Sequence, residues 1–175
     1  MVGGKLVLPG PHMDGKSIYD IIQAESCNKT CAVPTVMTVL IDHLDSNTLK
    51  IPSMTKIFIG GSAVPQSMIE SFEEKYDADV MHGWGRTETV VGTFNCSLPF
   101  MDELSFEQRI KVRCKQGRPP FGLEMKIIDD EGNSLPHDGV AFGKLMVRGL
   151  RVVERYYKAE ESALDSEGWF DTGDV

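Results

Sequence analysis

The chain has 175 residues, 41% of them hydrophobic and 25% charged, which is typical of a globular protein and excludes a disordered tail, a collagen or a coiled coil. Lys and Arg number 18 against 26 Asp and Glu, and the formal net charge of -8 disfavours nucleic acid and anionic membrane surfaces as partners. No apolar run approaches the ~20 residues of a membrane helix, so we expect no membrane span.

The first ninety or so residues alternate between short apolar runs, typical of buried strands, and segments with apolar residues at helical spacing. We expect strands at residues 5–8, 56–59 and from 80 onward, and helices at residues 17–24, 35–44 and 65–76, with a short apolar run at 31–33 that stops at Pro34. Strands separated by helices predict a parallel sheet.

The pattern changes near Gly117. Residues 124–129 and 143–148 alternate between apolar and polar side chains, which predicts antiparallel strands without a long helix. We therefore expect a partial α/β subdomain at residues 1–98, a connecting segment at 99–116 that contains a charged, solvated helix, and a β-rich subdomain at 117–175.

Two strand ends of the first part are rich in glycine, namely Gly60–Ala63 and His82–Glu88. Ligands of open parallel sheets bind at the carboxyl ends of strands, where glycines allow a close approach to the backbone. Trp84 offers a face for a base, Thr87 a hydroxyl and Glu88 an oxygen for Mg²⁺. These residues favour a bound nucleotide with its metal. The alternative is an α/β domain without nucleotide, with the glycines in ordinary turns and Trp84 in the core.

Several short blocks then resemble, in their order, the adenylate-forming (AMP-binding) superfamily, and within it the fatty acyl-CoA ligases. The blocks are Leu8-Pro9-Gly10, Val33-Pro34-Thr35, Gly60-Gly61-Ser62-Ala63, His82-Gly83-Trp84-Gly85-Arg86-Thr87-Glu88, Gly117-Arg118-Pro119-Pro120, Val147-Arg148-Gly149 and Gly168-Trp169-Phe170-Asp171-Thr172-Gly173-Asp174. The resemblance runs nearly from end to end. It implies part of the family's N-terminal domain, with a parallel α/β portion followed by an antiparallel β-barrel-like portion.

The resemblance also implies roles for matching residues. Thr87 would contact the α-phosphate, Glu88 would hold Mg²⁺, and Asp174 would accept hydrogen bonds from the ribose hydroxyls. Trp84 would stack on adenine, with His82 and Gly83 beside the adenine and the acyl pocket. The implied nucleotide-binding residues are Gly60, Gly61, Ser62, Ala63, His82, Gly83, Trp84, Gly85, Thr87 and Asp174.

The implied reaction has two steps and uses ATP, Mg²⁺, CoA and a fatty or other carboxylic acid. The carboxylate attacks the α-phosphorus of ATP, which yields acyl-adenylate and pyrophosphate, and the CoA thiol then displaces AMP. The carboxylate is already ionised at pH 7, so the first step needs no general base. The protein has to neutralise phosphate charge, and Thr87 and Glu88 are the residues expected to take part.

Two departures from the family pattern concern the expected site. Trp84 stands where tyrosine is commoner, so that stacking is kept while a phenol oxygen is replaced by an indole N–H. Arg86 stands where Met or Leu is usual. Its side chain could meet phosphate, line the acyl channel or simply be exposed to solvent, and the sequence leaves these alternatives open.

The resemblance also implies two parts that have no match in this sequence. They are an upstream phosphate loop and a C-terminal domain that carries a lysine. We therefore expect a fragment that is inactive alone. A non-catalytic remnant that binds adenine nucleotides, or an aryl- or short-chain-acid ligase, are the alternatives. The four scattered cysteines, and a start without a secretory signal, indicate an intracellular and most simply cytoplasmic protein, with a peroxisomal location open.

Overall fold

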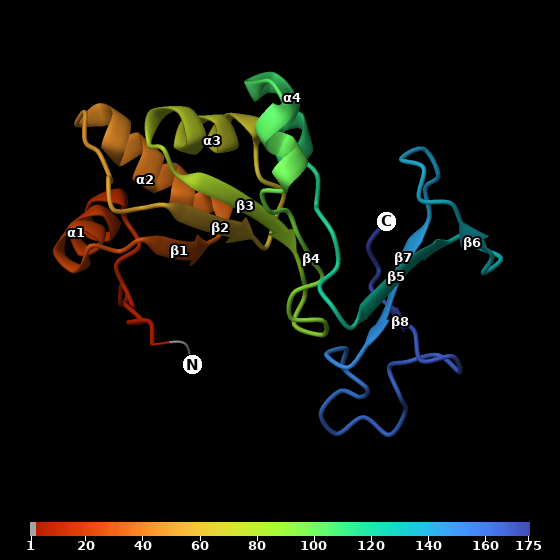
Figure 1. Ribbon diagram of the computed structural model, residues 1–175. Helices are drawn as coiled ribbons and strands as arrows, with labels where there is room; N and C mark the ends of the chain where they lie inside the picture. Colours follow the sequence, from red (N-terminus) through yellow and green to blue (C-terminus); the bar gives the residue numbers. More distant parts are fainter. Residues whose placement is uncertain (1–2) are drawn as a thin grey trace. The chain divides into compact units, whose positions relative to one another are not determined.

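The computed structural model describes residues 3–175, which form two compact units (Figure 1). The first unit comprises the residues up to Trp84 together with Phe94–Gly117. The second comprises Gly85–Thr93 and Arg118–Val175. One sheet has parallel strand pairs and the other is antiparallel, so the expected fold class is confirmed.

The first sheet has four strands in the order β1-β2-β3-β4. They are β1 (Lys29–Ala32), β2 (Lys56–Gly60), β3 (Asp79–Trp84) and β4 (Thr93–Phe94). β1 pairs with β2, and β2 with β3, in parallel register. Gly60 lies opposite Gly83 and Ile59 opposite His82, so the ends of β2 and β3 that the sequence singled out are neighbours.

Helices connect these strands, as their apolar spacing predicts. They are α1 (Gly15–Glu25), α2 (Pro34–Ser46) and α3 (Gln66–Glu70), which continues as the π-helical turn η1 (Ser71–Lys75). Asp14 caps α1 by accepting a hydrogen bond of 2.9 Å from the backbone N–H of Ser17, and Pro34 occupies the first turn of α2, where no N–H is needed. The helices and the sheet enclose a core in which Leu44, Ile57, Ile59, Ile69 and Phe72 are fully buried.

The strand predicted at residues 5–8 does not form, and that prediction was wrong. Leu6 and Leu8 are 82% and 74% exposed. A strand is stable only when its backbone groups are paired, and within residues 3–175 no strand pairs with this segment. The apolar run alone could not show whether a partner strand was within reach.

The segment expected to hold a solvated helix belongs to the first unit. It contains the 3-10 turn η2 (Pro99–Glu103) and the helix α4 (Phe106–Arg113), which lies beside α3 (Figure 1). Ser105 and Gln108 form a capping box at the start of α4. Ile110 and Arg113 are buried, so α4 packs on the unit rather than standing in solvent.

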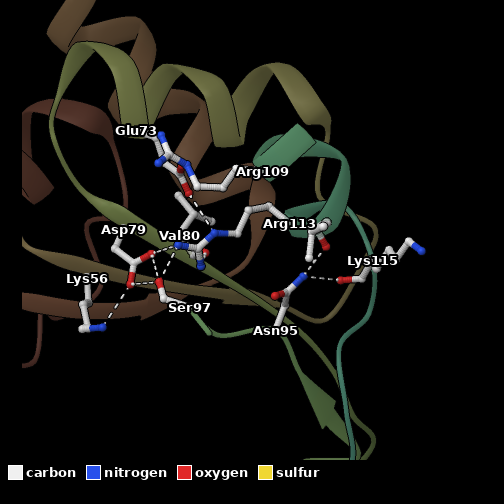
Figure 2. A network of polar contacts seen from close by, with 10 residues as sticks. Lys56, Glu73, Asp79, Val80, Asn95, Ser97, Arg109, Arg113 and Lys115 are labelled. Atoms are coloured by element: carbon white, nitrogen blue, oxygen red, sulfur yellow. Dashed lines mark hydrogen bonds and ion pairs between the residues drawn. The ribbon is translucent and has the colours of Figure 1, made fainter. Parts of the chain in front are cut away.

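Figure 2 shows the polar network through which Arg113 joins α4 to β3. Its Nη1 donates to the carbonyl of Val80 at 3.0 Å, and its Nη2 donates to Oγ of Ser97 at 2.7 Å. The same Nη2 forms an ion pair with Asp79, while Nε lies 3.3 Å from Oε1 of Glu73. The charged guanidinium is thus buried beside two opposite charges, a carbonyl and a hydroxyl, which offset the cost of removing it from water.

The second sheet is antiparallel, with the strand order β6-β5-β7-β8. Its strands are β5 (Leu123–Ile128), β6 (Ser134–Leu135), β7 (Lys144–Gly149) and β8 (Phe170–Asp171). The pairing of β5 with β7 agrees with the two alternating runs of the sequence. Within the described residues the sheet is open rather than closed as a barrel, because the outer strands β6 and β8 do not pair with each other.

No helix of the described chain has the length and apolar character needed to cross a membrane. All four cysteines are free thiols. Residues 3–175 contain no group of three or more His, Cys, Asp or Glu side chains placed to hold a metal ion.

Candidate functional site

In the first unit, the predicted residues gather at the ends of β2 and β3. A Cβ on Gly60 would lie 2.9 Å from the carbonyl oxygen of Gly83, so the backbones approach too closely there for a larger residue. Gly61 follows with a φ of +87°, a conformation that favours glycine, and the backbone turns away from the sheet. Ser62 and Ala63 are exposed in this turn. The turn therefore presents exposed backbone and small side chains to solvent.

His82 is the most unusual side chain of this group. It is 3% exposed, and within the described residues neither Nδ1 nor Nε2 has a hydrogen-bond partner. Burial lowers the pKa of the imidazole, so His82 is neutral near pH 7 and offers one donor and one acceptor. Its carbonyl accepts a 2.6 Å hydrogen bond from the backbone N–H of Asn95, which fixes the strand. Buried polar groups without partners are rare and point to a functional role.

Asn95 also fixes the helix that follows. Its Nδ2 donates to the carbonyls of Val112 at 2.6 Å and Lys115 at 3.0 Å, which satisfies two groups at the end of α4 (Figure 2). Because the backbone of Asn95 binds His82, α4 and the end of β3 are held by one residue. Trp84 ends β3 and is half-buried.

In the second unit, Gly85–Val90 forms a tight turn that presents Thr87 and Glu88. A Cβ on Gly85 would overlap the carbonyl oxygen of Val90. Oγ1 of the buried Thr89 accepts from the backbone N–H of Arg86 at 3.2 Å, and the carbonyl of Arg86 accepts from the N–H of Val90 at 2.7 Å. Val90 has a φ of +62°, strained for a β-branched residue, and such strain gathers at functional loops. Thr87 is exposed.

The Glu88 carboxylate is held by three groups of the same unit. The Tyr156 hydroxyl donates to Oε1 at 2.9 Å, and Nε of Arg86 lies 3.6 Å from Oε2. The backbone N–H of Glu88 itself, and then Tyr156, lower the pKa of the carboxyl, so Glu88 is ionised near neutral pH. Its carbonyl accepts a 2.8 Å hydrogen bond from the N–H of Val153, which fixes the backbone.

Asp174 lies near Arg86, the residue that also pairs with Glu88. Nη1 of Arg86 is 3.8 Å from Oδ2 of Asp174. The backbone N–H of Asp174 donates to Oγ1 of Thr172 at 3.1 Å, and its carbonyl accepts from Leu145 at 2.8 Å, so the residue is tied to β7. Arg86 thus contacts both Glu88, two residues along the chain, and Asp174, which is far away in the sequence.

Tyr156 is the residue that sequence reasoning missed. Its hydroxyl contacts Glu88 across 68 positions of the chain, so no local spacing could have paired the two. The predicted site residues fall into two sets. One set lies in the first unit, namely Gly60, Gly61, Ser62, Ala63, His82, Gly83 and Trp84, and the other in the second, namely Gly85, Thr87, Glu88 and Asp174.

Glu88 suits magnesium bound together with a phosphate ligand. Mg²⁺ retains several waters and is usually held by one or two carboxylates plus the oxygens of a substrate phosphate, so a single ionised carboxylate is sufficient. A site made wholly of protein ligands would need more donors, and the part of the chain that the structure describes holds no such group.

Comparison with known families and proteins gives a consistent result. The model of the family described as AMP-binding enzyme matches residues 1–157. The chain is 44% identical over 176 aligned residues to a 3-methylmercaptopropionyl-CoA ligase of Ruegeria lacuscaerulensis and to a medium-chain-fatty-acid–CoA ligase of Ectopseudomonas oleovorans. It is 36% identical to a long-chain-fatty-acid–CoA ligase of Thermus thermophilus. All of this chain is covered in each case, and it spans about a third of the relatives' length (33%, 32% and 33%).

Solved structures show the same fold. The anthranilate CoA ligase AuaEII in complex with anthranoyl-AMP matches 95% of this chain with a TM-score of 0.76 at 20% identity. A long-chain-fatty-acid-CoA ligase from Archaeoglobus fulgidus matches 91% with a TM-score of 0.72 at 23% identity. The chain covers 30% and 33% of these two proteins, and the likeness concerns the fold.

Proposed function

This chain belongs to the AMP-binding enzyme family, and we propose that it is part of an ATP-dependent fatty acyl-CoA ligase. The observation that carries the proposal is 44% identity over the whole chain to two acyl-CoA ligases. The chain spans only 33% and 32% of the length of those two relatives. The activity proposed is therefore that of the intact protein. Its substrates, ATP and CoA, are intracellular metabolites, and the proposal includes a cytoplasmic location.

In the first unit, the proposed ligand is adenine. The exposed turn Gly61–Ala63 would lie along one face of the base. The indole ring of Trp84 would stack on the other face by an aromatic contact. Gly60, which lies opposite Gly83, lets the two backbones approach closely beside the proposed base. His82, with two unpaired ring nitrogens, would supply hydrogen bonds beside the base and the acyl group.

In the second unit, the proposed ligands are the phosphates and the ribose. The exposed hydroxyl of Thr87 would donate to the α-phosphate, and the turn that begins at Gly85 holds it in place. Glu88 would hold Mg²⁺, which supplies positive charge to the phosphates when bound. Asp174, an acceptor with two oxygens, matches the two donors of a ribose diol.

These residues act mainly by position and charge. A fatty carboxylate is ionised at pH 7 and attacks the α-phosphorus without a base, while pyrophosphate leaves. Thr87 would lower the barrier by donating a hydrogen bond to the phosphate oxygens, on which negative charge gathers, and Glu88 would do so by holding the Mg²⁺ whose charge offsets theirs. The thiol of CoA then attacks the acyl carbon of the adenylate, and AMP leaves with the bonding electrons.

The experiment that tests this function is thioester formation by the intact protein with ATP, CoA and a panel of acids. Fatty acids of medium and long chain should give acyl-CoA, whereas benzoate and anthranilate should react poorly. A preference for the aromatic acids would support the aryl-acid ligase instead. Binding of adenine nucleotides without thioester from any acid would support the non-catalytic alternative.

Replacing Asp174 with Ala is expected to weaken ATP binding by about 1–3 kcal/mol, because hydrogen bonds to a charged acceptor are lost. Calorimetric titration of the intact protein with ATP and with 2′-deoxy-ATP measures this. The 2′-deoxy nucleotide should bind the wild type more weakly and lose less on mutation. Asp130→Ala removes an exposed carboxylate of the same unit, paired with Lys144 at 3.2 Å, and should leave both affinities unchanged. Equal affinities in wild type and D174A would rule out the ribose contact.

A further inference from the structure

Arg86 occupies a distinctive place in the second unit. Its guanidinium lies between two carboxylates, with Nε 3.6 Å from Oε2 of Glu88 and Nη1 3.8 Å from Oδ2 of Asp174. The side chain is 37% exposed, so solvent and solutes reach it. The guanidinium therefore neutralises both acids while remaining accessible.

The two ion pairs hold the side chain loosely. Charge-assisted N–H···O bonds are about 2.7–2.9 Å long, and both separations exceed that range. The backbone of Arg86 is fixed instead, since its N–H and its carbonyl are both hydrogen-bonded within the turn. The guanidinium can thus exchange partners by side-chain rotation alone. The pair with Asp174 that it gives up is exposed and weak, and the pair with Glu88 is long although Glu88 is only 17% exposed.

The chemistry of a nucleotide indicates which partner it would take. In the proposed function Asp174 holds the ribose and Glu88 holds the metal of the phosphates. The α-phosphate is bonded to the ribose 5′ oxygen, so a ligand held at both carboxylates places that phosphate between them. Arg86 lies between the same two carboxylates.

We propose that Arg86 is a phosphate-binding residue, which rests on the proposed function and adds a contact to it. Its guanidinium, paired with Glu88 and Asp174 in the free protein, binds the 5′-phosphate of the nucleotide in the complex. Arginine suits this role because its five N–H donors match phosphate oxygens two at a time and because it is always charged. The carboxylates it leaves are then taken up by the ribose and by Mg²⁺.

The test compares AMP with adenosine, which differ by the phosphate alone. Both are titrated calorimetrically into the intact protein in EDTA, which removes any metal contribution. Arg86→Met should weaken AMP binding about tenfold or more, as expected for lost hydrogen bonds to a charged group, and should leave adenosine binding within about twofold. Arg86→Lys should fall between, since it retains the charge without the fork. Arg151→Met removes an exposed arginine of the same unit and should change neither affinity.

Adenosine binding also reports that each variant is folded. If R86M binds AMP as tightly as the wild type, or more tightly, Arg86 is a surface charge or a competitor of the nucleotide, and the inference is overturned while the proposed function stands. Equal weakening of AMP and adenosine would also overturn it, since the phosphate would then not be involved. A wild-type protein that binds neither ligand would overturn both the inference and the proposed function.

Discussion

Replacing Arg113 with Met is expected to lower the free energy of unfolding of the first unit by about 3 kcal/mol. The side chain is 5% exposed and faces Glu73 and Asp79, which are themselves 10% and 23% exposed. Removing the guanidinium leaves both carboxylates short of a partner in a poorly solvated place, and burying an unpaired charge is costly. Asp79 keeps Lys56 at 3.0 Å, which limits the loss.

Urea unfolding of R113M and of a matched control measures this loss. Arg109→Met removes the same charge from the same helix, but Arg109 is 37% exposed and 3.8 Å from Glu73, so its loss should cost less than about 1 kcal/mol. Similar midpoints for the two variants would contradict the account, because burial is what distinguishes the two arginines.

The network also gives stability a dependence on pH. Burial alone would raise the pKa of Asp79, but Lys56 and Arg113 outweigh it, and the pKa is lowered. Its contribution to stability is therefore present above the pKa of an unfolded Asp and is lost as the pH falls through the lowered value. For Glu73, burial outweighs Arg113 and the pKa is raised. Its contribution is present below the pKa of an unfolded Glu and is lost as the pH rises through the raised value.

Replacing Glu88 with Gln is expected to lower kcat/KM for acyl-CoA formation about a hundredfold, roughly 2.7 kcal/mol of transition-state stabilisation. Gln has the same shape, and its amide oxygen can still accept from the Tyr156 hydroxyl, which lies 2.9 Å from Oε1 in the wild type. What is lost is the negative charge proposed to hold Mg²⁺. The apparent Mg²⁺ requirement should rise, and the midpoint of thermal unfolding should barely change.

Steady-state rates at varied Mg²⁺ concentration check this prediction. Glu124→Gln is the matched control, because Glu124 is an exposed carboxylate of the same unit whose only role in view is a 2.7 Å pair with Arg148. It should leave kcat/KM and the Mg²⁺ requirement unchanged. If E88Q retained more than about a third of the wild-type kcat/KM, Glu88 would not be the metal carboxylate.

The sequence predicts much of the fold because its elements obey local rules. Pro34 in a first turn, the apolar spacing before Glu25, and the apolar run at β2 each depend on neighbours within a few residues. The prediction of a strand at residues 5–8 was wrong because strand formation depends on pairing with a partner that can be distant in the sequence. The burial of α4 was not predicted, because a charged residue such as Arg113 is normally expected in solvent. Its partners Glu73 and Asp79 are distant in the sequence, and only the structure places them beside it.

The candidate site likewise has residues that the local sequence predicts and contacts that only the structure shows. Gly60 and Gly85 were predicted as site residues from the local sequence. The structure shows why glycine is needed there, because a backbone carbonyl lies too close to each position for a larger residue. The contact of Tyr156 with Glu88 joins residues 68 positions apart, which no spacing rule covers. The departure at Arg86 was visible in the sequence, but only the two flanking carboxylates give it a chemical meaning.

The intact protein is proposed to activate a fatty carboxylate, which attacks the α-phosphorus of ATP. The most direct measurement is the exchange of labelled pyrophosphate into ATP, with and without a medium-chain fatty acid and without CoA. We expect exchange that requires both the acid and Mg²⁺ and that falls in E88Q. Exchange that is absent with every acid tried, or ADP and phosphate formed in place of AMP and pyrophosphate, would contradict the proposal.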